Sequence, residues 1–252
     1  MTTLLIDGDP IAYAKSCANE NTIDWGDGEP TVSFDVNAAI TEMDAEIERI
    51  KRDVGVKKVI VAISCSSAQG WRRQVLPTYK HKRAGVIPPG PLTACKAHLA
   101  DKWKAYLRPT LEADDVLGIL ATHPTLVPGD KIVVSIDKDL LQVPGRVYNP
   151  RRETMEHVSV EQADYRHMMQ TLTGDTVDGY TGLPGCGPKG AAKMLAAYGV
   201  QWSTVVTAYE AKGLTEEDAL VQARVARICR ASDYDFKLKK VKLWQPSHTA
   251  TS

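Results

Sequence analysis

Acidic side chains occur in four short groups, and they are the residues best suited to do chemistry. The groups lie in the stretches DGD, LEADDVLG, SIDKDLL and GDTVDG, and they supply Asp7 and Asp9; Glu112, Asp114 and Asp115; Asp137 and Asp139; and Asp175 and Asp178. If the groups converge in the fold, mutual repulsion raises the pKa of these carboxyl groups and destabilises the protein. Hard divalent cations remove that conflict because they prefer oxygen ligands. This many carboxylates suits two ions about 4 Å apart, which clamp the attacking and leaving oxygens of a phosphodiester.

Two other interpretations of the acids stay open at this point. Acids at turns and helix starts often only bind backbone N–H groups. The stretch DGD also resembles phosphatases of the haloacid dehalogenase type, in which the first Asp attacks phosphorus. That interpretation leaves LEADDVLG unexplained, and GDTVDG is spaced more tightly than the GDxxxD of those enzymes.

A basic stretch, WRRQVLPTYKHKR at residues 71–83, contains no acid. Basic side chains interleaved with aromatic rings suit a phosphate backbone with exposed bases. The alternative is an ordinary solvated basic loop. The nucleic-acid-binding candidates in this stretch are Arg72, Arg73, Tyr79 and Lys82, and Lys80 and Arg83 lie near its end.

A glycine-rich turn, GLPGCGPKGAAKML at residues 182–195, opens a predicted helix with the pattern GxGxK. Glycines let backbone N–H groups approach a phosphate, and a helix N-terminus favours an anion. The spacing differs from the GxxxxGK[ST] of a nucleotide-binding loop. It predicts a hairpin that grips a duplex backbone without reading sequence, or alternatively an ordinary packing turn between helices. The residues that would make the grip are Gly185, Gly187, Lys189 and Lys193.

The elements that must position these residues alternate between strands and helices. Apolar runs at 3–6, 56–64 and 131–137 predict buried strands, and a helix capped by Asp35 and a second helix at 110–122, with Thr110 as its cap, lie between them. This order predicts an α/β fold with a central, mostly parallel sheet flanked by helices. Binding and active sites of such sheets lie at the carboxyl ends of the strands, which is where Asp7 and Asp137 are expected.

From about residue 150 the sequence becomes helical. Helices are predicted at 159–174, with Ser159 as cap and Gln162 three residues later, from Lys189, and at 214–231. The prediction is therefore an α/β core at residues 1–150 and a helical, DNA-binding region at residues 151–252.

Composition excludes several classes. The 252 residues contain 31 Lys+Arg and 31 Asp+Glu, so a nucleic-acid site must come from local clustering of charge. The five cysteines form no CxxC pair, which argues against a zinc finger or disulfide framework and favours a reducing cytoplasm. We expect no membrane span, because no apolar stretch approaches the required length of about 18 residues.

Together these motifs resemble the flap endonuclease family, especially the 5′→3′ exonucleases of bacteriophages, over nearly the whole chain. The resemblance implies a PIN-like nuclease core, a basic helical arch at about 80–106, and a helix–three-turn–helix at about 160–198. It assigns Asp7, Glu112, Asp114 and Asp115 to one metal site and Asp137, Asp139, Asp175 and Asp178 to a second. Two Mg²⁺ are implied, with Mn²⁺ as a substitute and a K⁺ at the helix–three-turn–helix. Lys80 and Arg83 would neutralise charge on the scissile phosphate.

The implied activity is cleavage of DNA from 5′ ends or flaps in phage replication, primer removal or DNA degradation. The substrates would include DNA with a free 5′ end or RNA in an RNA/DNA hybrid, acted on by a monomer in the host cytoplasm. One position departs from the family, whose members commonly carry another Asp at the end of the second strand. Ser64 or Cys65 stands there in this chain, so a weakened enzyme that only clamps branched DNA is an alternative.

Overall fold

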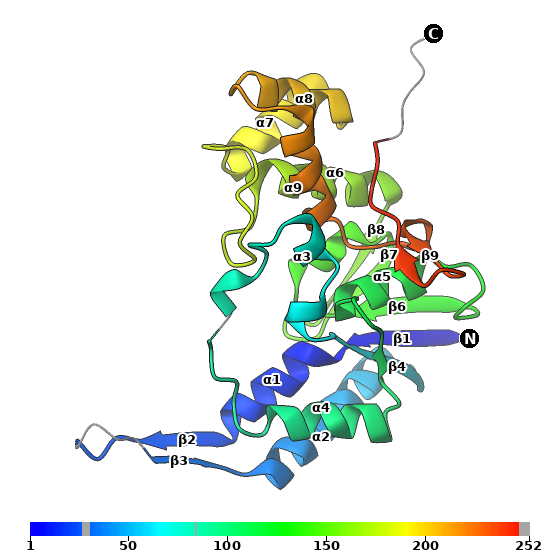
Figure 1. Cartoon of the computed structure of the whole chain (residues 1–252). Helices are drawn as coiled ribbons and strands as arrows, with labels where there is room; N and C mark the ends of the chain where they lie inside the picture. Colours follow the sequence, from blue (N-terminus) through cyan, green and yellow to red (C-terminus); the bar gives the residue numbers. More distant parts are fainter. Residues whose placement is uncertain (27–30, 84, 247–252) are drawn as a thin grey trace.

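The central sheet of the computed structural model has six strands in the order β5-β4-β1-β6-β7-β8 (Figure 1). The structure describes residues 1–26, 31–83 and 85–246. The strands are β1 Thr2–Asp7, β4 Lys58–Ile63, β5 Tyr106–Leu107, β6 Asp130–Val134, β7 Gly145–Asn149 and β8 Thr154–Val158. Every neighbouring pair is parallel except β7 with β8. The predicted mostly parallel sheet is confirmed, and its antiparallel edge strand lies beyond residue 150.

Helices cover both faces of the sheet. On one face are α1 (Gly8–Ala18), α2 (Val36–Val54) and α4 (Leu92–Lys102), packed on Leu4 and Ile6; on the other is α5 (Ala113–Thr122), packed on Leu5. Successive side chains of a strand point to opposite faces, so β1 contributes to both cores. This three-layer arrangement fixes β1 rigidly at the centre of the molecule.

The helix boundaries follow capping rules that the sequence contains. The Asp35 side chain accepts the Ala38 N–H at 2.9 Å, and Ser159 and Gln162 cap each other's backbone N–H groups at the start of α6 (Val160–Thr173). The predicted Thr110 cap is wrong: α5 begins at Ala113, and the hydroxyl of Ser64 accepts the Ala113 N–H at 2.9 Å.

The remaining helices form a third core cluster beside the sheet. They are α6, α7 (Pro188–Tyr198), α8 (Trp202–Glu210) and α9 (Glu216–Ala226), and α6 packs against the other three. Beyond α9 the chain returns to α5, where a Cβ on Gly118 would lie only 2.3 Å from the Cys229 carbonyl oxygen. The short ribbon of β9 (Tyr234–Asp235) and β10 (Lys240–Val241) follows.

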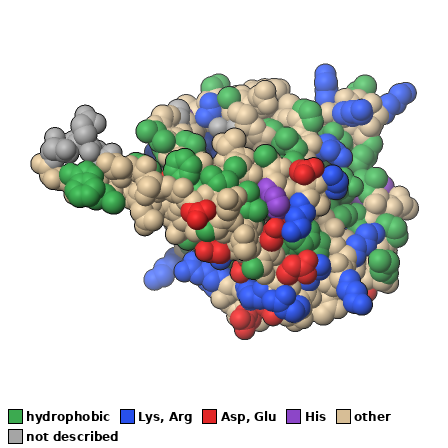
Figure 2. Space-filling model, turned by 90° about the horizontal axis from the view of Figure 1, so that it is seen from below, with side chains coloured by type: hydrophobic (Ala, Val, Ile, Leu, Met, Phe, Trp, Pro, Cys, Tyr) green, Lys and Arg blue, Asp and Glu red, His purple; other side chains and the backbone are tan. Residues whose placement is uncertain are grey.

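Shorter elements complete the chain. Helix α3 (Arg72–Val75) lies in the basic stretch, and single 3-10 turns occupy Ser67–Gln69, His81–Arg83, Lys138–Gln142 and Ala231–Asp233. A ribbon of β2 (Glu20–Ile23) and β3 (Thr31–Phe34) projects from the body (Figure 2). Phe34 at its end and Trp25, which follows β2, are exposed. Among the described residues, no helix combines the length and apolar character needed to cross a membrane.

Candidate active site

Acids gather at the carboxyl edge of the sheet, as the strand order predicts. Strand β1 ends at Asp7, and the neighbouring parallel strand β6 ends just before Ser135 and Asp137. The Ser135 hydroxyl donates to Asp7 Oδ2 at 3.0 Å and accepts the Asp137 N–H at 3.0 Å. Asp7 is buried, and its Oδ1 has no hydrogen-bond partner among the described residues.

Asp7, Asp114, Asp137, Asp139 and Asp175 have no Lys, Arg or His partner within 4 Å in the described part of the chain. Asp175 accepts backbone N–H groups instead, and we call the other four the uncompensated acids. Burial, then the charges of Asp9 and Asp137, raises the pKa of Asp7 to about 7. Burial, then the charges of Asp7 and Asp137, holds the pKa of Asp114 well above its usual value. Burial and the Asp137 charge raise the pKa of Asp139 to about 6. These carboxylates repel one another, and burial of Asp7 weakens the screening by water.

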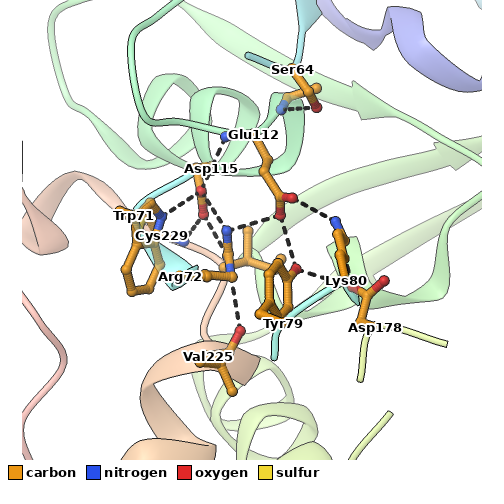
Figure 3. A network of polar contacts seen from close by, with 12 residues as sticks. Ser64, Trp71, Arg72, Tyr79, Lys80, Glu112, Asp115, Asp178, Val225 and Cys229 are labelled. Carbon is orange, nitrogen blue, oxygen red and sulfur yellow. Dashed lines mark hydrogen bonds and ion pairs between the residues drawn. The ribbon is translucent and has the colours of Figure 1, made fainter. Parts of the chain in front are cut away.

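Three other acids contact cations of the basic stretch, and we call them the paired acids: Glu112, Asp115 and Asp178. Both oxygens of Asp115 bind the Arg72 guanidinium, at 2.7 and 2.8 Å (Figure 3). Asp115 also accepts the indole N–H of Trp71 at 2.9 Å and the backbone N–H of Cys229 at 3.1 Å. Burial disfavours its charge, but the Arg72 charge and hydrogen bonds outweigh burial and hold the Asp115 pKa below its usual value.

Glu112 and Asp178 bind the end of the basic stretch. Lys80 Nζ lies 2.6 Å from Glu112 Oε1 and 3.5 Å from Asp178 Oδ2, and Arg83 donates to Asp178 Oδ1 at 2.9 Å. The Tyr79 hydroxyl lies 3.0 Å from Glu112 and 3.1 Å from Asp178 (Figure 3). The Lys80 N–H also donates to the Asp178 carbonyl at 2.7 Å. The basic stretch is therefore fastened to the GDTVDG loop.

This fastening changes the roles predicted for two residues. Arg72 is 2% exposed and Tyr79 is 5% exposed, and both point into the acid network. Their predicted contacts with DNA are therefore wrong for this conformation, because neither side chain reaches the surface. By contrast, Lys82 and Arg83 are exposed and Arg73 is partly exposed.

The glycine-rich turn that is predicted to bind a duplex backbone leads into α7. Gly185 has a φ of +76°, which favours glycine, and Gly187 is the residue before α7. Lys189 and Lys193 are exposed on the first two turns of that helix. A helix N-terminus favours an anion, so the start of α7 and these two lysines suit a phosphate.

The predicted arch at 80–106 is only partly free of the body. Its helix, α4, packs against α1 and α2, and Asp44 of α2 binds His98, Lys102 and Trp103. The segment that bridges from the 3-10 turn His81–Arg83 to α4 is the apolar, glycine- and proline-rich stretch at 85–91. The helix of the predicted arch is therefore held against α2 by the Asp44 carboxylate.

The position that departs from the family pattern has a structural role. Ser64 caps α5, and its own N–H donates to Asp9 Oδ2 at 2.9 Å. Lys96 of α4 lies 2.7 Å from the other oxygen of Asp9. The sequence did not reveal Lys96 or Ser135 as neighbours of the acids, because each comes from a different element.

The donor set fits hard divalent cations. Buried carboxylates, an unpartnered Asp7 oxygen and mutual repulsion are the conditions that such an ion relieves. Within the described ranges, no three His, Cys, Asp or Glu side chains are arranged to hold one ion directly. An ion held here would keep water ligands or would require these side chains to rotate. Asp175, whose Oδ1 accepts the Val177 and Asp178 N–H groups, lies beside Asp139 and adds to this edge.

Comparison with known proteins gives consistent results. A family model described as 5′-3′ exonuclease, N-terminal resolvase-like domain, matches residues 2–170. The exodeoxyribonuclease of Enterobacteria phage T3 is 24% identical over 290 residues, which covers 96% of this chain and 92% of that protein. The exonuclease of Escherichia phage T7 is 25% identical over 284 residues, which covers 96% of this chain and 93% of that protein.

A solved structure shares the fold. It is the bacteriophage T5 flap endonuclease in a pseudo-enzyme-product complex with DNA and metal ions, with a TM-score of 0.59 and 15% identity. The match covers 90% of this chain and 89% of that chain.

Proposed function

This chain belongs to the 5′-3′ exonuclease family, and we propose that it cleaves DNA from 5′ ends and flaps with two divalent metal ions held by its clustered acids. The relatives named above are phage exonucleases, and the T5 relative is a flap endonuclease crystallised with DNA and metal ions. The observation that carries the metal proposal is the group of uncompensated acids at the strand edge. No purely structural role explains four clustered carboxylates that repel one another, with Asp7 buried and Asp114 and Asp139 half-buried.

Asp7, Asp114 and Asp137 would hold the first ion, and Asp139 and Asp175 the second. Glu112 and Asp178 lie at the border of both and would join after release from Lys80 and Arg83. The ions supply charge stabilisation at the phosphodiester and a water of lowered pKa. Mg²⁺ is the proposed ion and Mn²⁺ its substitute. Asp115 is not among the proposed ligands, because five donors already occupy its oxygens.

The chain's own cations would bind the substrate. Lys80 and Arg83 lie beside the acids and would bind the scissile phosphate once these carboxylates coordinate metal instead. Arg73 and Lys82 would contact the backbone further along the strand. Lys189 and Lys193, with the N-terminus of α7 and a K⁺ at the hairpin, would hold the duplex. The proposed substrates include RNA in an RNA/DNA hybrid. The protein would act as a monomer in the host cytoplasm.

A 5′-labelled duplex with a short flap tests the function. We expect short labelled fragments with Mg²⁺ or Mn²⁺, none with EDTA, and none from the Asp114→Asn variant. Intact DNA with every metal, together with a retained gel shift, would show a DNA clamp instead of a nuclease. Turnover of para-nitrophenyl phosphate would instead support a phosphatase.

A further inference from the structure

Arg72 is the most completely bound side chain of the acid network. Its Nε donates to the Val225 carbonyl at 2.9 Å, and Nη1 donates to Glu112 at 3.0 Å and Asp115 at 2.7 Å. Its Nη2 donates to Asp115 at 2.8 Å and to the Arg227 carbonyl at 2.6 Å. All five guanidinium N–H donors are therefore used, and 2% of the residue is exposed.

The partners of Arg72 come from two distant parts of the chain. Glu112 and Asp115 lie at the start of α5, which also carries Asp114. The Val225 and Arg227 carbonyls lie at the end of α9, where a helix leaves carbonyl groups unsatisfied. One guanidinium therefore fastens the end of the helical region to the helix that bears the acids (Figure 3).

From this geometry we propose that Arg72 is a positioning residue, which acts through Glu112 and Asp115 to fix α5 and its acids relative to the other strand-edge carboxylates. The proposal rests on the metal-dependent function above. Arg72 does not touch the substrate, because it lies beneath the acids. Its planar fork binds both Asp115 oxygens and one Glu112 oxygen at once, which a lysine cannot do.

The fork also limits how Glu112 can move. Arg72 and Tyr79 both bind Oε2 of Glu112, whereas Oε1 binds only Lys80. Lys80 is the partner that a phosphate can attract, so Oε1 becomes free while Oε2 stays held. Glu112 would then present one defined oxygen toward the uncompensated acids instead of sampling several rotamers.

The test uses Arg72→Lys, which keeps the charge but loses the fork. We expect the variant to stay folded, with single-turnover flap cleavage reduced about 10- to 100-fold, as is usual when a partner of a metal ligand is lost. The Ca²⁺ affinity measured by calorimetry should fall in the same range, whereas DNA affinity in Ca²⁺ should change little. Arg49→Lys on α2, which also loses a forked ion pair with Glu46 and Asp53, is the matched control.

A second variant separates positioning from simple stabilisation. Arg72→Gln with Asp115→Asn removes both buried charges and keeps groups that can hydrogen bond. If Arg72 only stabilises the fold, this pair restores cleavage and Ca²⁺ affinity whenever it restores the melting temperature. If Arg72 positions Glu112, both remain low in a fully folded protein. Wild-type cleavage and Ca²⁺ affinity in Arg72→Lys would overturn the proposal, and wild-type cleavage in Asp114→Asn would instead overturn the proposed function.

Discussion

The uncompensated acids and the paired acids occupy one site and meet at the start of α5, yet they have opposite surroundings. Asp114 and Asp115 are neighbours in sequence, but Asp114 faces other carboxylates whereas Asp115 faces Arg72. The pKa of Asp114 is raised and that of Asp115 is lowered. The comparison shows that burial alone does not define a functional acid. A buried acid with its own cation supports the fold, whereas a buried acid without one is costly unless a ligand supplies the charge.

The largest expected effect is on flap cleavage, and it comes from Asp7→Asn, which neutralises an uncompensated acid. We expect flap cleavage to fall by at least about 10³-fold, because a lost metal ligand removes several kcal/mol of charge stabilisation. The same change should raise the melting temperature in EDTA at pH 8, because it removes a buried, repelled charge. Each kcal/mol relieved corresponds to about 2–4 °C in a chain of this size.

Calorimetry in EDTA and a cleavage assay in Mg²⁺ check the two halves of this prediction. Asp130→Asn, which neutralises an exposed acid at the opposite end of the sheet, is the control. A melting temperature that falls in Asp7→Asn would show that Asp7 is a supporting residue like the paired acids.

For a paired acid the expected sign of the stability effect is reversed. Asp115→Ala leaves the buried Arg72 charge without its main partner, which should destabilise the fold by about 3–5 kcal/mol. Urea unfolding monitored by tryptophan fluorescence measures this loss. Asp115→Asn should lose less, since the amide oxygen still accepts hydrogen bonds, and its cleavage should fall no further than that of Arg72→Lys. If Asp115→Asn were folded but inactive, Asp115 would belong with the metal ligands.

The acid groups also predict a pH dependence of stability. The pKa of Asp7 rises from 3.8 to about 7 and that of Asp139 to about 6 on folding. The folded protein therefore binds more protons than the unfolded chain between pH 4 and 7, and its metal-free stability should fall as the pH rises through this window. Above about pH 7 these two groups add no further slope.

Melting curves in EDTA between pH 5 and 8 measure this slope. Asp7→Asn should flatten it, and added Ca²⁺ should raise the melting temperature more at pH 8 than at pH 5, because protons must leave before the ion binds. A slope of the same size in Asp7→Asn would assign it to other residues.

Much of this site follows from sequence, and what does not follow has a physical reason. The alternation of apolar strands and helices predicts the parallel sheet, and strand ends predict that Asp7 and Asp137 meet. Helical spacing also predicts that Glu112 and Asp115 share a face and that Asp114 points elsewhere, which is the division between the paired and uncompensated acids.

The sequence could not identify the cation on that face. The basic residues of WRRQVLPTYKHKR cannot be distinguished from the sequence alone. Arg72 is buried because it contacts the end of α9, whereas Lys82 is exposed. The attachment of α4 to α2 depends in the same way on a tertiary contact, because Asp44 of α2 is far from α4 in sequence. The exposed ribbon β2–β3 lacks a buried face, so it gives no periodic signal.

The smallest expected effect is on DNA affinity in EDTA, and it comes from Asp178→Asn, which neutralises a paired acid. Arg83 and Lys80 are bound to Asp178 in the structure, so a phosphate must compete with this carboxylate for them. Neutralising Asp178 should therefore raise DNA affinity about 2- to 10-fold at low salt, and the gain should shrink as salt screens the phosphate contacts.

Fluorescence anisotropy with a labelled flap duplex at several salt concentrations measures this gain. Asp130→Asn again changes the net charge equally but lies far from the basic stretch, so it should leave the affinity almost unchanged. An equal gain in both variants would mean that net charge, not release of Lys80 and Arg83, controls binding. A gain confined to Asp178→Asn would show that a paired acid occupies the place of the phosphate until metal draws it away. The two acid groups would then be linked, because binding of metal at one would favour binding of DNA at the other.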